Sequence, residues 1–294
     1  MADEPVAVGL VGAGPWASMV HAPILAAGPE THLAAVWARR PDVAQHLAAQ
    51  HGAHACADVE DLFDRCEAVA FAVPPEVQAE LAARAAAAGK ALLLEKPIAA
   101  DLDGAERLAD AVGQAGVRSM VVLSWRYAAS VRTFLEQASA FDAVGGRGTF
   151  VSAALLGGPF ATPWRLERGA LPDLGPHVVD LLDAALGRVV DVRAHGRSLG
   201  WVGMLLDHEG GRVSEATMCA VAGVEPQRAG VEVYGPDGVL EIDCASAVGV
   251  EAFVTLRREF AATVRGEPHP LDVGRGLHLQ RIIAAAESQL SASP

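Results

Sequence analysis

The first 125 residues alternate between short apolar runs and segments with helical spacing, and this alternation restricts the fold more than any other feature. Continuous apolar runs are typical of strands that are buried on both faces. Repeated strand–helix units predict an α/β fold with a doubly wound parallel sheet. We expect strands at 6–11, 32–37, 68–73, 91–94 and 117–124, and helices at 16–27, 41–51, 76–88 and 102–115.

The rest of the chain has a different pattern. Strand-like runs follow one another and are separated by glycine-rich turns such as Glu209-Gly210-Gly211. Consecutive strands with short turns predict an antiparallel sheet. We therefore expect two domains, residues 1–125 and residues 126–294, the second an α+β domain with a mostly antiparallel sheet. Its expected strands are 148–155, 189–197, 201–208, 213–221, 229–234 and 239–242, and its expected helices are 130–138, 177–186 and 276–289.

The overall charge excludes several classes of partner. The net charge of −13 argues against nucleic acid and against an anionic membrane surface, since both need a basic face on the protein. No apolar stretch is long enough to predict a transmembrane helix. The sequence shows no signal peptide, so its four cysteines are expected to be reduced thiols of a cytoplasmic protein.

A metal site is not predicted. His51, His54 and Cys56 lie close together in the sequence, and short segments of this kind sometimes bind zinc. Cys66 is too far along the chain to complete a familiar zinc spacing, and polar loops often hold a histidine that binds nothing.

A glycine motif follows the first expected strand and opens the first expected helix. Gly12-Ala13-Gly14-Pro15-Trp16-Ala17 fits the pattern G-x-G-x-x-A. The first glycine permits a tight turn, the second lets a pyrophosphate approach the backbone, and Ala17 allows close helix packing. The helix N-terminus adds N–H donors and a favourable dipole. The motif predicts a dinucleotide cofactor bound by Gly12, Gly14, Pro15 and Trp16.

The end of the second expected strand indicates which dinucleotide is used. Enzymes that bind NAD place Asp or Glu there to hold the ribose 2′-hydroxyl. This chain reads Ala35-Val36-Trp37-Ala38-Arg39-Arg40-Pro41, without an acid and with two arginines. Arginine pairs with a 2′-phosphate in bidentate fashion, although a solvated basic pair would look the same. We predict NADP rather than NAD, with Ala38, Arg39 and Arg40 at the cofactor.

Lysine is rare in this chain. Of the 23 basic residues only Lys90 and Lys96 are lysines, and Lys96 follows the fourth expected strand. Ligands bind at the carboxyl ends of the strands in open α/β sheets. An ammonium group can shift its pKa and transfer a proton, whereas a guanidinium stays charged. The alternative is an ordinary surface lysine at the start of a loop.

A second polar motif lies in the later half of the chain. Asp173 precedes His177 by four residues within Asp-Leu-Gly-Pro-His, and Pro176 predicts a helix that starts just before His177. A helix N-terminus disfavours protonated histidine, which suits a neutral proton relay. The alternative is an aspartate that caps the helix and a histidine whose hydrogen bonds are satisfied in the core.

Together these motifs resemble the Gfo/Idh/MocA family of glucose–fructose oxidoreductase and inositol dehydrogenase. The resemblance covers nearly the whole chain and rests on the glycine motif, Glu95-Lys96-Pro97, Trp164-Arg165 and Asp173-x-x-x-His177. It implies a Rossmann domain followed by a domain with an open antiparallel sheet, which often forms the subunit interface of a homodimer or homotetramer. It also implies hydride transfer between a nicotinamide cofactor and a carbinol carbon of a sugar, cyclic polyol or similar polar substrate.

The resemblance further implies roles for individual residues. Lys96 positions and polarises the reacting oxygen, His177 is the general acid/base, and Asp173 helps to hold the substrate. A base of near-neutral pKa removes the hydroxyl proton, and a fixed cation stabilises the developing alkoxide. Implied cofactor contacts are Val73, Pro74, Glu95, Lys96, Pro97, Trp164 and Arg165, and implied substrate contacts are Arg126, Tyr127, Asp173 and His177.

The chain also departs from the family pattern. At 294 residues it is short for the family, with the loss between Asp243 and Glu251, and Gln78 stands near the place of a common histidine. Two other functions stay open: a non-catalytic NADP-binding sensor or regulatory protein, and a reductase of a non-sugar carbonyl. The combination of Lys96, Asp173 and His177 argues against the first, and the residues do not select between substrates.

Overall fold

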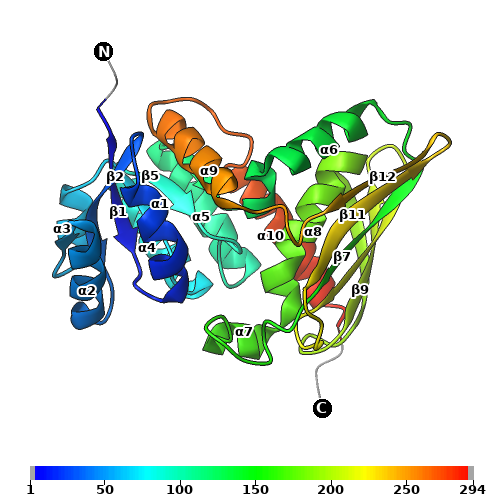
Figure 1. The fold of residues 1–294 in the computed structure, drawn as a ribbon, viewed down its shortest axis with the longest axis horizontal. Helices are drawn as coiled ribbons and strands as arrows, with labels where there is room; N and C mark the ends of the chain where they lie inside the picture. Colours follow the sequence, from blue (N-terminus) through cyan, green and yellow to red (C-terminus); the bar gives the residue numbers. More distant parts are fainter. Residues whose placement is uncertain (1–3, 291–294) are drawn as a thin grey trace. The chain divides into compact units, whose positions relative to one another are not determined.

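A parallel sheet of six strands organises the N-terminal part of the computed structural model, which describes residues 4–290. The strand order is β3-β2-β1-β4-β5-β6, and every pair is parallel. This confirms the doubly wound sheet (Figure 1). The strands are β1 (Val6–Val11), β2 (Thr31–Trp37), β3 (His54–Ala55), β4 (Ala68–Phe71), β5 (Ala91–Leu94) and β6 (Ser119–Val121).

Helices connect these strands, as the alternating pattern predicts. They are α1 (Ala22–Ala26), α2 (Pro41–His51), α3 (Val59–Asp64), α4 (Pro75–Ala87) and α5 (Leu102–Ala115). The segment predicted as one helix at 16–27 contains a π-helical turn, η1 (Ala17–His21), before α1. Asp58 and Asp101 cap α3 and α5 by accepting backbone N–H groups, since the first turn of a helix has unpaired donors.

The chain divides into two compact units, and the first is discontinuous. It consists of Met1–Val122 and Phe253–Leu277, which include most of α9 (Val250–Val264) and the start of α10 (Val273–Glu287). The backbone N–H of Val121 donates to Leu271, with an N···O distance of 2.7 Å. The sequence prediction assigned residues 253–277 to the second domain, 126–294, and α9 was not predicted.

The second unit consists of Leu123–Ala252 and His278–Pro294. Its sheet has the order β12-β11-β7-β10-β9-β8 and is antiparallel except between β7 and β10. This confirms the expected mostly antiparallel sheet. The strands are β7 (Gly145–Val151), β8 (Val189–Gly196), β9 (Val202–His208), β10 (Val213–Cys219), β11 (Arg228–Gly235) and β12 (Gly238–Asp243).

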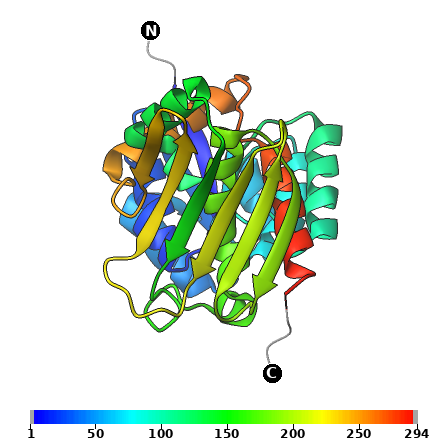
Figure 2. The ribbon, with the colours of Figure 1, turned by 90° about the vertical axis from the view of Figure 1, so that its right-hand side faces the viewer.

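One face of this sheet is covered and the other is open. The helix α8 (Ala170–Leu186) packs against the central strands, and 16 of its 17 residues are buried. The smaller helices are η2 (Ser124–Tyr127), α6 (Ala129–Ala140) and α7 (Pro163–Arg168). Figure 2 shows the opposite face turned to the viewer, and no described helix lies over it.

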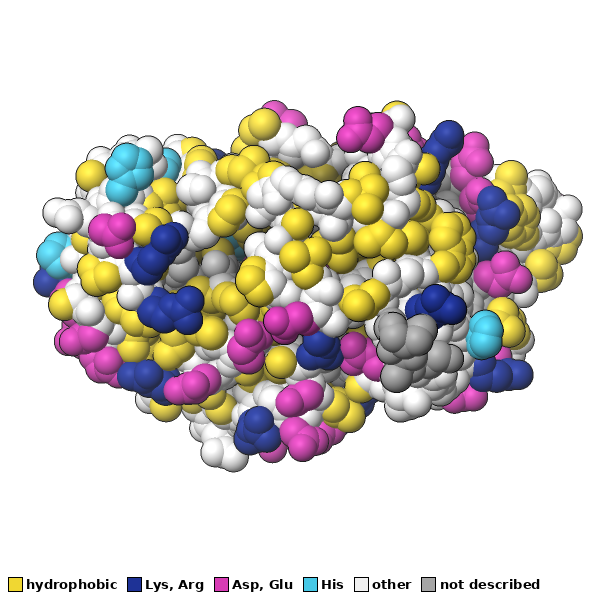
Figure 3. Space-filling model, turned by 90° about the horizontal axis from the view of Figure 1, so that it is seen from below, with side chains coloured by type: hydrophobic (Ala, Val, Ile, Leu, Met, Phe, Trp, Pro, Cys, Tyr) yellow, Lys and Arg dark blue, Asp and Glu magenta, His cyan; other side chains and the backbone are white. Residues whose placement is uncertain are grey.

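The described surface carries charged side chains of both signs. On the face drawn in Figure 3, the described acidic and basic side chains are interspersed rather than separated into large areas of one sign. Among the described residues no helix is both long and apolar enough to span a membrane. The first three residues, where an export signal would begin, lie outside the described part of the chain.

Candidate functional site

The glycine turn after β1 has the shape that a dinucleotide needs. Gly12 has φ +117°, and its N–H donates to Trp37 O at 2.8 Å. A Cβ on Gly12 would lie 2.3 Å from Ala72 O, so no other residue fits without movement of the backbone. A Cβ on Gly14 would meet no heavy atom within 4 Å. The turn is thus closed at Gly12 and open at Gly14, where a pyrophosphate can approach the backbone.

Glu95, at the end of β5, connects this turn to the next part of the site. Its Oε1 accepts a hydrogen bond from Trp16 Nε1 at 2.6 Å and lies 2.8 Å from His21 Nε2. Its Oε2 accepts from the backbone N–H of Lys96 at 3.3 Å. Glu95 and Trp16, both expected at the cofactor, therefore join the loop after β5 to the helical segment that follows the glycine turn. Sequence reasoning missed His21, which also contacts Glu95.

A buried glutamine fixes the loop that contains Lys96. Gln78, in α4, is fully buried, and its Nε2 donates to the carbonyls of Glu95, Pro97 and Ile98 at 2.8, 3.3 and 3.2 Å. Its Oε1 accepts from the N–H of Glu95 at 2.8 Å. One side chain thus holds the backbone on both sides of Lys96, which is partly buried and precedes a cis peptide bond to Pro97.

The residues predicted at the cofactor in the first unit share one edge of the sheet. Each group directly follows a strand: the glycine turn follows β1, the two arginines follow β2, the turn with Val73 follows β4, and Lys96 follows β5. Carboxyl ends of parallel strands meet at the same edge. Arg39, Arg40 and Pro74 are exposed, and Ala38 and Val73 are half-buried.

The prediction of a helix that begins at His177 was wrong. The helix α8 starts at Ala170, and Pro176 lies inside it, so His177 is not at the helix N-terminus. A proline inside a helix removes one backbone hydrogen bond and costs about 3 kcal/mol. Burial of nearly the whole helix outweighs this cost. Asp173 lies in the first turn of α8 and is not its cap, since the N-cap residue is Gly169 and no side-chain cap is present, so the capping alternative was also wrong.

His177 lies in an aromatic setting that sequence reasoning missed. Its ring is 5.1 Å from that of Trp125 and 6.3 Å from that of Phe150, and only 8% of the residue is exposed. The two aromatic rings are themselves 5.1 Å apart. They restrict the orientation of the imidazole and limit the access of water to it. The available sequence signal for Trp125 was its position directly before residues 126–127, which were predicted to contact the substrate.

An ion pair and a cation–π contact bring other predicted residues together. Arg165 Nε lies 3.1 Å from Asp173 Oδ2, and the same guanidinium lies 4.7 Å from the ring centroid of Trp164. Arg165, in the predicted cofactor segment Trp164-Arg165, therefore contacts Asp173, the residue that was predicted to hold the substrate. The pair also shows that Asp173 is a partly compensated charge within its own unit.

Arg126 and Tyr127 have different settings. Arg126 Nη1 donates to both carboxylate oxygens of Asp180 at 3.1 Å, and Asp180 is 1% exposed. Tyr127 is also 1% exposed, so its side chain belongs to the core of the second unit. Asp173, His177 and Asp180 recur every three or four residues and lie on one face of α8, a spacing that could have indicated Asp180 but was not used.

Comparison with known protein families gives a match in the first half of the chain. A family model described as "Oxidoreductase family, NAD-binding Rossmann fold" matches residues 6–123. Levoglucosan dehydrogenase of Pseudarthrobacter phenanthrenivorans is 28% identical over 134 residues, which are 43% of this chain and 34% of that protein. The dTDP-3,4-didehydro-2,6-dideoxy-α-D-glucose 3-reductase of Actinomadura kijaniata is 35% identical over 107 residues, 36% of this chain and 32% of that protein.

These matches span about a third of the length of each curated relative. Solved structures extend the likeness of the fold to nearly the whole chain. The structure of GenD2 from gentamicin A biosynthesis, in complex with NAD, has a TM-score of 0.88 and 23% identity, and covers 98% of this chain and 95% of that chain. At this identity the likeness shows the fold.

Proposed function

We propose that this protein, whose residues 6–123 belong to the Gfo/Idh/MocA family of oxidoreductases, is a dehydrogenase or reductase that depends on a nicotinamide dinucleotide. Its substrate would be a sugar, a cyclic polyol or a similar polar molecule with a CH–OH group. The observation that carries the proposal is the turn that is closed at Gly12 and open at Gly14. The names of the two curated relatives, a levoglucosan dehydrogenase and a reductase of a dTDP-linked sugar, support the substrate class.

The residues of the first unit would bind the cofactor and polarise the substrate oxygen. When bound, the nicotinamide accepts or supplies the hydride. The backbone at Gly12 and Gly14 would hold the pyrophosphate. Lys96, fixed on both sides by the hydrogen bonds of Gln78, would donate a hydrogen bond to the reacting oxygen. A cation held in place at that oxygen stabilises the alkoxide that forms when the hydroxyl loses its proton.

The residues of the second unit would handle the proton and hold the substrate. We propose His177 as the general acid/base, because imidazole exchanges a proton near neutral pH. Its aromatic neighbours Trp125 and Phe150 support this role by limiting its orientations. Asp173 would hold a substrate hydroxyl, and Arg165 would hold that carboxylate in position. Arg126 would line the substrate site while it is anchored on Asp180.

The cofactor preference is a separate proposal. Arg39 and Arg40 are exposed after β2, and residues 35–41 contain no carboxylate, which supports NADP. NAD is the cofactor named for the family model and in the GenD2 complex. The test is a fluorescence titration with NADPH and NADH. We expect tighter binding of NADPH and a loss of this preference in Arg39→Ala. Equal affinities for the two cofactors would overturn the preference.

The activity test is a screen for reduction of NAD⁺ and NADP⁺ with sugars, anhydrosugars, inositols and nucleotide sugars. For an active substrate, Lys96→Ala is expected to lower turnover by orders of magnitude while cofactor binding persists. Lys90→Ala is the matched control, because Lys90 is the only other lysine and donates to Cys66 O at 3.0 Å. Cofactor binding without turnover of any substrate would favour the non-catalytic alternative.

The open face of the second sheet supports a homo-oligomer. This uncovered face exposes apolar side chains on five of its strands, of which the largest are Val190, Leu205, Val213, Tyr234 and Val239. Exposed apolar groups on one face are typical of subunit interfaces. We propose a homodimer or homotetramer through this sheet, to be tested by light scattering of the wild type and of Leu205→Glu. The four cysteines are free thiols, which supports a reducing, cytoplasmic setting.

A further inference from the structure

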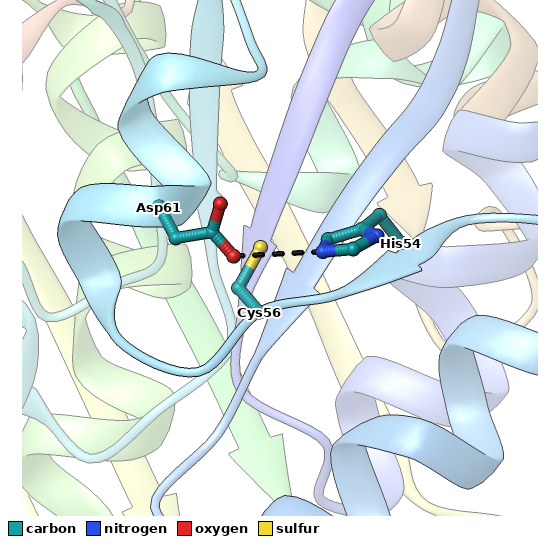
Figure 4. A group of neighbouring side chains, drawn as sticks. All are labelled: His54, Cys56 and Asp61. Atoms are coloured by element: carbon teal, nitrogen blue, oxygen red, sulfur yellow. Dashed lines mark ion pairs between the residues drawn. The ribbon is translucent and has the colours of Figure 1, made fainter.

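A cluster of three potential metal ligands lies in the first unit, apart from the residues assigned above. His54, Cys56 and Asp61 each offer one ligand atom, and these atoms all lie within 4.8 Å of one another. Figure 4 shows the three side chains pointing toward one another, His54 and Cys56 from the segment at β3 and Asp61 from α3. The sequence argument against zinc considered His51 and Cys66 as the further ligands. The fold instead brings Asp61 close to His54 and Cys56.

The backbone holds all three residues in place. His54 pairs with Ala35 in the sheet, and the N–H of Cys56 donates to Val36 O at 2.9 Å. Asp61 lies in the first turn of α3, and its N–H donates to Asp58 Oδ1 at 2.8 Å. Two of the ligands therefore belong to the edge of the sheet and the third to a capped helix. Ligands supported in this way keep their positions before a metal binds.

The carboxylate of Asp61 is oriented by a neighbour. Arg65 Nε donates to Asp61 Oδ1 at 2.7 Å. The other oxygen, Oδ2, lies 3.5 Å from His54 Nε2. An arginine that holds one oxygen of a ligating carboxylate is a common outer-shell partner in metal sites. It leaves Oδ2 directed at the imidazole and the thiol.

The separation of the His54 and Asp61 ligand atoms suits a tetrahedral ion. Zinc–nitrogen and zinc–oxygen bonds of about 2.0–2.2 Å place the two ligand atoms about 3.4 Å apart at tetrahedral angles. The observed separation of 3.5 Å between His54 Nε2 and Asp61 Oδ2 is close to this value and is long for a hydrogen bond. The side chains of His54 and Asp61 are 49% and 29% exposed, which leaves room for a water as fourth ligand.

We propose that His54, Cys56 and Asp61 form a binding site for a divalent transition-metal ion, with zinc as the preferred ion. On binding the metal, the Cys56 thiol would release its proton to water, and the resulting thiolate and the carboxylate together would neutralise the charge of the dication. Nitrogen, sulfur and oxygen ligands in a tetrahedral arrangement are those that zinc prefers among the biological metals. The site ties β3 to α3 beside the end of β2, and it does not depend on the proposed redox function.

The test is a titration of the metal-free protein with Co²⁺, which reports a bound thiolate through a charge-transfer absorption band. We expect one Co²⁺ per chain and displacement by Zn²⁺. Cys56→Ser should lose the band, and His54→Ala should bind at least about tenfold more weakly. His46→Ala is the matched control, because His46 is also exposed and lies on the neighbouring helix α2. It should bind as the wild type does.

Several results would overturn the proposal. They are the absence of the band in the wild type at millimolar Co²⁺, a band that persists in Cys56→Ser, and equal weakening in His54→Ala and His46→Ala. If Cys56→Ser does not fold, His54→Ala decides, because the half-exposed imidazole of His54 contributes little to the core. Retained affinity in that variant would show that the cluster is an ion pair beside a buried thiol.

Discussion

Replacement of Gln78 by leucine tests whether one buried amide holds the Lys96 loop. The two amide hydrogens serve three carbonyls and the amide oxygen accepts one N–H, so about three full hydrogen bonds are lost. At about 1 kcal/mol each, and with the N–H of Glu95 left unsatisfied, the loss is about 4–5 kcal/mol. Burial of the leucine side chain returns about 1–2 kcal/mol. We expect Gln78→Leu to lower the free energy of unfolding by about 3 kcal/mol.

Urea unfolding, followed by tryptophan fluorescence, measures this change. In the same variant we expect turnover to fall more than cofactor affinity does, because the backbone on both sides of Lys96 is no longer fixed. Gln50→Leu is the control, since Gln50 is exposed on α2 and its replacement should change the stability by less than about 0.5 kcal/mol. Gln78→Glu keeps the acceptor but replaces the donors, so it should be no more stable than Gln78→Leu.

A stability loss below about 1 kcal/mol in Gln78→Leu would refute the reasoning about the loop. A large loss of stability with a turnover equal to that of Gln50→Leu would have a different meaning. Gln78 would then stabilise the first unit without positioning Lys96.

The other predictions concern both units. Gly12→Ala should lower the stability of the cofactor-free protein by about 3 kcal/mol or more in urea unfolding, because its Cβ would meet Ala72 O at 2.3 Å at a positive φ. Gly14→Ala should leave that stability within about 0.5 kcal/mol but weaken cofactor binding in a fluorescence titration, since its Cβ enters open space. Arg126→Ala should cost about 3–5 kcal/mol, because it leaves the Asp180 carboxylate buried without this partner, and Arg126→Ala with Asp180→Asn should recover part of the loss. Burial, with a smaller effect of the neighbouring aspartate, raises the pKa of the Cys244 thiol from 9.0 to about 12. The unfolded chain loses this proton first, so the contribution to stability is complete below pH 9 and falls as the pH rises toward 12. Unfolding midpoints measured across this range should fall less steeply in Cys244→Ala.

Most of the first sheet follows from the sequence because its strands are continuous apolar runs. Segment 91–94 and the helices at 41–51 and 102–115 agree with the structure at every boundary. By contrast, β3 has two residues, of which His54 is exposed, so no apolar run indicates it. The helix α8 was misread at its start because Pro176 is a helix breaker by local rules. Burial on all sides, a property of the tertiary fold, overrides that rule.

The candidate site was predictable where a backbone requirement limits the residue type. Gly12 is such a case, since its conformation excludes a side chain. The partners of the site residues were not predictable, because they come from distant parts of the chain. His21 meets Glu95 across 74 residues, and Arg126 meets Asp180 across 54. No local pattern in a single sequence specifies such pairs.

The discontinuous first unit has a consequence for synthesis on the ribosome. The chain emerges from its N-terminus, yet Arg257 pairs with Glu30 at 2.8 Å, and the N–H of Val273 donates to Ser119 Oγ at 3.0 Å. The parallel sheet can form early, but its unit lacks α9 until about nine-tenths of the polypeptide has been made. Residues 123–252 of the second unit, which lie between these two segments in the sequence, are fully translated by then. A nascent chain arrested after residue 125 should therefore be open to proteases where α9 would later pack.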